Sequence, residues 1–150
     1  MDPITYNPIP SSARYYAVRL KPGDDLLVEL RRFVEAAGLR AATIVTCVGS
    51  LTKATLRFAH TGVWTEHSGF FEIVSLVGTI DAKSEHVHIA ISDSKGKTLG
   101  AHLVPGSSVF TTAEVVLAEL PELEFSREPC AQSGYPELII EPRTSPAKPA

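Results

Sequence analysis

The pattern of hydrophobic and polar positions predicts one amphipathic helix in the first third of the chain. Its apolar positions recur at helical spacing, and charged side chains occupy the opposite face. An aspartate of the preceding turn can cap the first turn, and Gly38 can end the last one. We therefore expect a helix over about residues 24–37, whose apolar stripe packs into the core. That stripe consists of Leu26, Leu27, Leu30, Phe33, Val34 and Ala37.

After Gly38 the pattern is typical of strands. Residues 41–48 are almost continuously apolar, as in a strand buried on both faces, and alternation resumes over 51–59 after a Gly-Ser interruption. A loop is expected over 60–68. Residues 109–120 carry mixed signals, because their β-branched residues favour a strand and their Ala/Glu/Leu ending favours a helix; we favour a strand. Further strands are predicted at 15–20, 69–80, 85–92, 98–104 and 123–125.

Together these elements predict a single α+β domain, a mostly antiparallel sheet of about seven strands with one main helix. The length of 150 residues and the 44% of apolar residues suit one domain with its own core. We place this domain at 13–127. Residues 1–12 are expected to form an irregular arm, and the proline-rich residues 128–150 a mobile tail unless a neighbour holds Leu138–Ile140.

One helix cannot cover both faces of a large sheet. The other face must be polar, closed on itself, or buried against another subunit. The segment 73–77 has few polar positions, which favours burial at an oligomer interface.

Histidines are the main concentration of chemistry in the sequence. His86 and His88 are two residues apart on a predicted strand, so their side chains project from the same face. If Ser92 pairs with Thr98 across the turn at 93–97, His88 lies opposite His102. Opposed Cβ atoms are about 5 Å apart and the diagonal neighbour is within about 8 Å, so the three imidazoles could converge on one ion.

Three neutral imidazoles suit zinc and leave its fourth position open for water or a ligand. A water in that position would have a lowered pKa and could support hydrolysis. Glu72, on another predicted strand, could orient one histidine through a hydrogen bond. The alternative is that these are ordinary surface or interface histidines, since a register slip of one residue would remove His102 from the group.

The other reactive side chains give weaker signals. His60 and His67 flank the loop around Trp64 and are expected to be solvated, although they could contribute to a site. Cys47 lies in an apolar run and is interpreted as a small core residue rather than a nucleophile. Two cysteines without a CxxC spacing do not make a disulfide framework, and no P-loop or nucleophile elbow is present.

The net charge and the hydropathy of the chain limit the classes of binding partner and the location that we expect. A formal charge of −3 gives no support for a stand-alone nucleic-acid binder, so direct DNA binding is not expected. No apolar run approaches the roughly 18 residues of a membrane span, and the first residues do not resemble a signal peptide. An intracellular location is expected, cytoplasmic by default with the nucleus left open.

Several segments together resemble the PPC domain, also called DUF296, of stand-alone bacterial and archaeal proteins and of plant AT-hook proteins. The resemblance runs from about Arg14 to Phe125, and the order and spacing of the segments carry it. The one small departure is Ala101, where the family often has a second glycine. The matching segments are Arg19–Asp25, Gly69–Thr79, His86–His88, Gly100–Leu103 and Thr112–Val116.

The resemblance implies a homotrimer with a metal, expected to be zinc, at His86, His88 and His102. It also implies self-association through the strand at 69–76, with interface residues Phe71, Ile73, Val74 and Leu76. In the plant members DNA binding comes from a separate AT-hook with an Arg-Gly-Arg-Pro core, which is absent from this sequence.

Three functions follow as hypotheses. The first is a trimeric binding or regulatory module for an unknown ligand, with metal that is structural or ligand-binding. The second is a metal-dependent hydrolase or lyase acting on a small molecule. The lack of a positioned general base near the histidines argues against this hypothesis. The third is a DNA-associated regulatory protein without its own AT-hook. The negative formal charge of the chain argues against this hypothesis.

Overall fold

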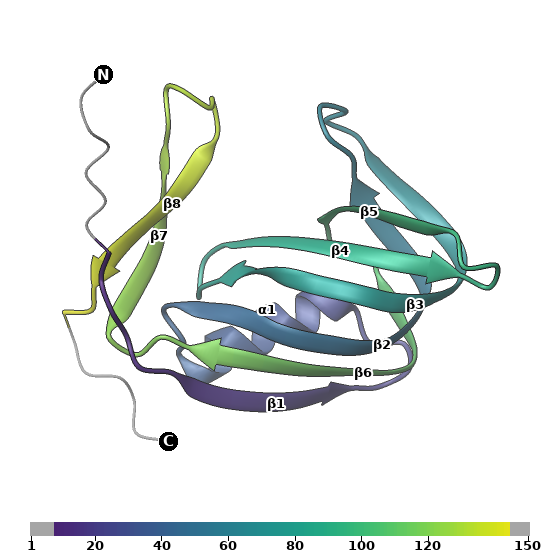
Figure 1. The fold of residues 1–150 in the computed structure, drawn as a ribbon, viewed down its shortest axis with the longest axis horizontal. Coiled ribbons are helices and arrows are strands. Elements are labelled where there is room, and N and C mark those ends of the chain that lie inside the picture. Colours follow the sequence, from purple (N-terminus) through teal and green to yellow (C-terminus); the bar gives the residue numbers. More distant parts are fainter. Residues whose placement is uncertain (1–7, 145–150) are drawn as a thin grey trace.

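A computed structural model describes residues 8–144 of the chain. Within this range one helix, α1 (Leu26–Ala37), accompanies eight strands (Figure 1). The strands are β1 (Arg14–Leu20), β2 (Ala42–Arg57), β3 (Trp64–Ile80), β4 (Glu85–Asp93), β5 (Thr98–Leu103), β6 (Ser108–Glu119), β7 (Leu123–Pro129) and β8 (Pro136–Pro142). The predicted α+β class with a mainly antiparallel sheet is confirmed. No helix in this range is long and apolar enough to cross a membrane.

Six strands form one sheet in the order β1-β6-β2-β3-β4-β5, and β7 pairs with β8 in a separate two-stranded sheet. All the pairings are antiparallel. The far end of β2 also pairs with β5, through Leu56 with Leu103 and Arg57 with His102. The strands β2, β3, β4 and β5 therefore close on themselves at one end of the sheet.

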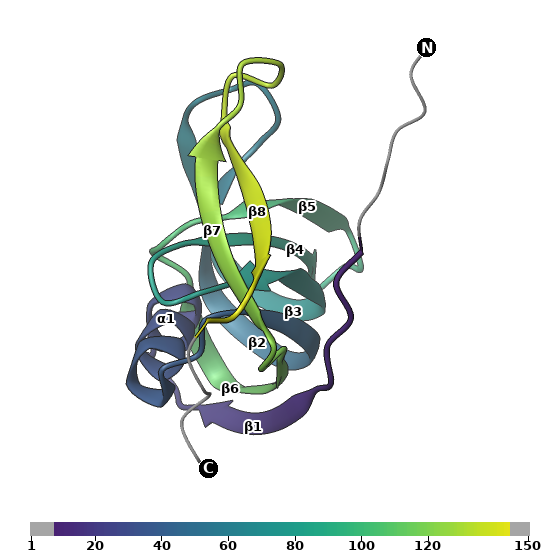
Figure 2. The same ribbon diagram turned by 90° about the vertical axis from the view of Figure 1, so that its left-hand side faces the viewer.

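The helix forms where the sequence predicts it and covers one face of the sheet (Figure 2). One carboxylate oxygen of Asp25 accepts hydrogen bonds from the backbone N–H groups of Leu27 and Val28, at 3.1 and 3.0 Å. Gly38, with φ of 67°, ends the helix in the left-handed conformation that glycine adopts without strain. The predicted apolar stripe supplies core residues, among them Leu26, Leu27, Leu30 and Val34.

The structure joins two predicted strands into one. The sequence predicts separate strands over 41–48 and 51–59, yet β2 runs unbroken through Gly49. Gly49 has φ of 154°, and a Cβ there would collide with the backbone carbonyl of Thr112 on β6. Glycine at this position therefore allows close strand approach instead of ending the strand. The expected loop over 60–68 is also shorter, because β3 begins at Trp64 and pairs with the end of β2.

The ambiguous segment 109–120 is a strand, β6, as favoured from the sequence, and it pairs with both β1 and β2. The expectation of a mobile tail from 128 needs correction, because β8 pairs with β7 along its whole length. Arg143, just beyond β8, forms an ion pair of 3.2 Å with Glu119, and both side chains are at most 5% exposed. Residues 8–12 of the expected arm have no helix or strand, whereas 1–7 and 145–150 lie outside the described residues.

Away from the helix, the sheet carries large apolar side chains that are exposed. They include Val45 and Val48 on β2, Val74 and Val77 on β3, and Phe70 packed on Phe110 with ring centroids 4.8 Å apart.

Of the four interface residues predicted on β3, only Val74 is largely exposed. Ile73 and Leu76 are 6% and 2% exposed and belong to the monomer core, Phe71 packs against that core, and Val74 is 57% exposed. The register shift between Ile73 and Ser75 accounts for this division, since a bulge changes which residues face outward.

Candidate metal centre

The three histidines come together on β4 and β5 in the predicted register. Ser92 pairs with Thr98 and His88 with His102, as the length of the turn between the strands indicated. His86 and His88 are exposed while Val87 between them is fully buried. The alternation of the strand therefore places both imidazoles on the outer face and anchors the strand through Val87.

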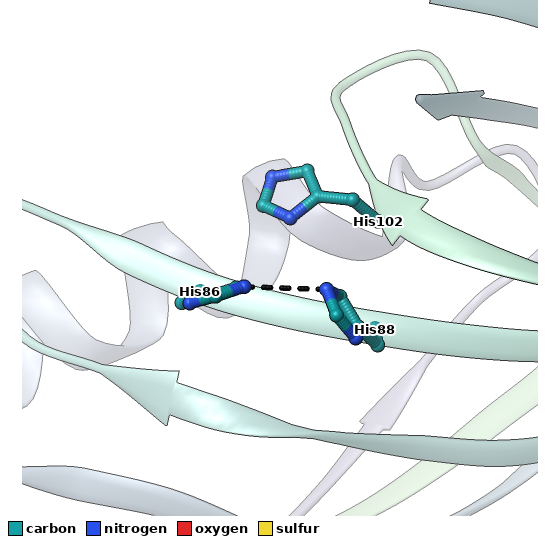
Figure 3. Close-up of side chains that lie close together, drawn as sticks. All are labelled: His86, His88 and His102. Atoms are coloured by element: carbon teal, nitrogen blue, oxygen red, sulfur yellow. Dashed lines mark hydrogen bonds between the residues drawn. The ribbon is translucent and has the colours of Figure 1, made fainter. Parts of the chain in front are cut away.

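The imidazoles converge closely enough to share an ion (Figure 3). The Nε2 atoms of His86 and His88 are 3.2 Å apart, and one ligand nitrogen from each of the three residues lies within 4.8 Å of the others. Two nitrogens bound to one tetrahedral zinc at 2.0–2.1 Å are separated by about 3.3 Å. The Nε2 atoms of His86 and His88 already have this spacing, and a ring nitrogen of His102 lies within 4.8 Å of the other two residues' ligand atoms.

The electrostatics of the cluster favour neutral rings, which are the form that binds metal. Burial, and then the positive charge of Arg57, lower the pKa of His102 to about 4. Burial, followed by the neighbouring His88 and Arg127, also lowers the pKa of His86. The Nδ1 atom of His102 is buried without a hydrogen-bond partner among the described residues. The donor set therefore fits zinc, with a fourth position left for water or a ligand.

The structure does not bring Glu72 to the histidines. Glu72 is exposed and lies opposite Ser50 on β2 and Ser92 on β4. Ser92 is four residues along β4 from His88, which is roughly 13 Å. The expectation that Glu72 orients a metal ligand is therefore wrong, because adjacency of strands does not fix position along them. Glu85, the residue before His86, points towards the helix instead, and its carboxylate forms a bidentate ion pair with Arg31.

Two arginines beside the cluster were not identified from the sequence. Arg57, near the end of β2, lies directly opposite His102. Arg127 on β7 donates a hydrogen bond of 3.3 Å from Nη2 to Thr79 Oγ1, and Thr79 lies opposite His86 on β3. Nothing in the local pattern could reveal them, because the β2–β5 pairing and the position of β7 are long-range features.

The remaining candidate side chains do not join the three-histidine cluster, although His60 lines the same cleft as His86 and His102. His67 packs edge-to-face against Phe58, with ring centroids 5.8 Å apart. His60 is exposed and has a positive φ of 58° in the turn after β2. Cys47 is a buried core residue, as predicted, and burial raises its pKa to about 11. None of these three contributes to the three-histidine cluster.

Comparison with known proteins places this geometry in a family. A model of the Plants and Prokaryotes Conserved (PCC) domain matches residues 8–121, which agrees with the resemblance in the sequence. A hypothetical protein from Salmonella cholerae-suis has a structure with a TM-score of 0.89 and 50% identity, over 90% of this chain and 98% of that one. A protein from Archaeoglobus fulgidus, described as metal-containing, has a TM-score of 0.76 at 24% identity, over 89% and 99% of the two chains.

A curated relative is a bifunctional protein GlmU of a Synechococcus strain, 44% identical over 136 residues. The match covers 89% of this chain but only 21% of that relative, so the chain spans about a fifth of its length. The family match extends over more than two thirds of the residues described above and includes all three histidines. The chain belongs to the Plants and Prokaryotes Conserved (PCC) domain family.

Proposed function

We propose that this protein is a homotrimeric binding or regulatory module in which His86, His88 and His102 hold a zinc ion for an exchangeable ligand. The observation that carries the proposal is the convergence of three ligand nitrogens within 4.8 Å on the outer face of the sheet. Such a site is open on one side, whereas a purely structural zinc is usually enclosed by four protein ligands. The description of the Archaeoglobus fulgidus protein as metal-containing supports a metal in this fold.

The apolar side chains outside the core support the trimer. Val48 on β2 and Val74 and Val77 on β3 are each more than half exposed, although they lie in the middle of the sheet. Exposed apolar groups on neighbouring strands are typical of a protein interface. Val77 lies directly opposite His88, so an interface that covers these valines would pass beside the metal centre.

Binding is favoured over catalysis because of what the nearby carboxylates do. Glu85 is held by Arg31, and Glu72 is remote from the histidines. Glu137 on β8 is exposed and forms no hydrogen bond with the histidines in the described part of the chain, so no carboxylate is positioned as a base on a metal-bound water. Metal-dependent catalysis on a small molecule is therefore the second candidate function. Direct DNA binding is not part of the proposal, because the chain has a formal charge of −3.

Zinc analysis of protein purified without a His-tag tests the metal site. We expect about one zinc per chain in the wild type, less than a tenth of that in His88→Ala, and no loss in His67→Ala. His67→Ala is the matched control, because His67 lies on β3 outside the cluster and packs against Phe58. Wild-type protein with less than about 0.1 equivalent and no uptake on adding zinc would overturn the proposal.

Light scattering on the same zinc-loaded sample tests the assembly. A mass of about three chains is expected, from a chain of 16.2 kDa. A monomer would overturn the trimer and leave the metal site to be judged by its zinc content alone.

A further inference from the structure

A cleft of about 450 Å³ opens beside the histidines and reaches the tip of the β7–β8 hairpin. Its lining includes His86, His102, Arg57 and Arg127, together with His60 from the turn after β2. The apolar part of the wall consists of Ala59 after β2 and of Tyr135 and Pro136 at the hairpin. Figure 1 shows β7–β8 standing on one side of β4 and the β2–β3 hairpin on the other.

The first arginine is fixed in place by the sheet. Arg57 pairs with His102 across β2 and β5, so the two side chains leave the same face about 5 Å apart at Cβ. No carboxylate among the described residues forms an ion pair with Arg57. Its positive charge acts on the histidine cluster, because it contributes to the lowered pKa of both His86 and His102.

The second arginine also lacks an acidic partner in the described part of the chain. Arg127 donates from Nη2 to the hydroxyl of Thr79, while its Nε is buried with no hydrogen-bond partner. A buried donor without a partner costs free energy, and it is retained most readily where a ligand supplies the acceptor. Thr79 lies opposite His86, which holds the guanidinium group near the metal centre.

The carboxylates on the cleft do not cancel these charges. Glu85 is already neutralised by Arg31. Glu137, on β8, is exposed and is the other carboxylate on the lining. Two guanidinium groups and a zinc ion therefore outweigh one solvated carboxylate, and the cleft attracts an anion.

We propose that this cleft binds a small organic carboxylate, whose carboxylate group takes the open position on the metal and accepts hydrogen bonds from Arg57 and Arg127. Guanidinium groups bind planar carboxylates through paired hydrogen bonds, and the apolar wall suits an organic body. This proposal rests on the proposed function, because the metal supplies the central contact.

Cobalt-loaded protein separates this proposal from the metal site itself. Cobalt(II) takes the place of zinc and reports its coordination through visible absorption bands. Butyrate, acetate and inorganic phosphate are titrated into wild type, Arg57→Gln, Arg127→Gln, Glu137→Gln and the control Arg32→Gln. Arg32 lies on α1 and pairs with Glu29, outside the cleft.

We expect butyrate to shift the bands of the wild type with a lower Kd than acetate, because its chain packs on Tyr135. Loss of either cleft arginine is expected to raise the Kd for butyrate by roughly tenfold. Glu137→Gln should lower it, since a like charge is removed, and Arg32→Gln should leave it unchanged.

Cobalt bands that respond to none of the anions, or to phosphate alone, would overturn the carboxylate proposal and leave the metal site standing. An equal response in Arg57→Gln, Arg127→Gln and wild type would also overturn it. Absence of any cobalt bands, combined with absence of zinc uptake, would overturn the metal site and this proposal with it.

Discussion

Arg57 lies directly opposite His102, because β2 is long enough for its last residues to pair with β5. The contact joins two segments 45 positions apart in the sequence, and it places a fixed positive charge beside one member of the three-histidine cluster. It is also one reason, after burial, for the lowered pKa of His102.

This relationship predicts the protonation of His102 in the metal-free protein. Its pKa of about 4 means that the ring stays neutral as the pH falls from 8 to 5, whereas an ordinary histidine would take up a proton near 6.5. NMR of the imidazole signals measures this. Arg57→Gln should move the midpoint upward and Arg32→Gln should not. A wild-type midpoint near 6.5 would contradict the geometry.

Gly78 allows β3 to approach β4 beside the three-histidine cluster. It has φ of 156°, and a Cβ there would collide with the backbone carbonyl of His86. Gly78→Ala is therefore expected to lower the free energy of unfolding by about 3 kcal/mol or more and to weaken zinc binding. Gly96→Ala is the control, because φ is also positive at 80° but nothing lies within 4 Å. Denaturant unfolding should show a loss of only about 1 kcal/mol there. Equal losses in the two variants would refute the close approach.

The exposed apolar face predicts how the proposed trimer can be dissociated. Val74→Asp should convert the proposed trimer into a folded monomer, because a charge cannot be buried there without a partner. Val63→Asp is the matched control, since Val63 has a similar exposure, 60% against 57%, but precedes β3 in the turn. Light scattering and circular dichroism separate dissociation from unfolding. A Val74→Asp trimer would place the interface elsewhere.

Asp25 links the helix to the turn before β6. Its second carboxylate oxygen accepts from the backbone N–H groups of Gly106 and Ser107, at 2.6 and 3.1 Å. Asp25→Ala removes four hydrogen bonds and is expected to cost about 3 kcal/mol of unfolding free energy. Asp24→Ala, which loses one bond to the backbone of Lys21, should cost under about 1 kcal/mol by the same denaturant measurement. Similar costs would show that the link to Gly106 contributes nothing.

The two cysteines should differ sharply in reactivity. Cys47 is buried and its pKa is raised to about 11, so it carries almost no thiolate at pH 8. Hydrogen bonds from the backbone of Ser133 and Gln132 lower the pKa of Cys130 in the hairpin turn. Mass spectrometry after brief treatment with iodoacetamide at pH 8 should find Cys130 alkylated and Cys47 unmodified until the protein is denatured. Labelling of Cys47 in the native state would place it outside the core.

The sequence by itself determined the features that depend on neighbours along the chain. The helix, its aspartate cap and its terminal glycine follow from local periodicity and capping chemistry. The pairing of His88 with His102 follows from the length of one tight turn, because a hairpin fixes its own register. The three-histidine cluster could therefore be predicted from the sequence alone.

The tertiary structure decided what surrounds that cluster. The closure of β2 on β5 brought in Arg57, the β7–β8 hairpin brought in Arg127, and the position of Glu72 along its strand removed it from the centre. The buried ion pair between Arg143 and Glu119 likewise holds the end of the C-terminal segment against the domain, although the local composition of that segment predicts a mobile tail. Such contacts join residues far apart in sequence and depend on the packing of the whole sheet, so the local pattern carries no record of them.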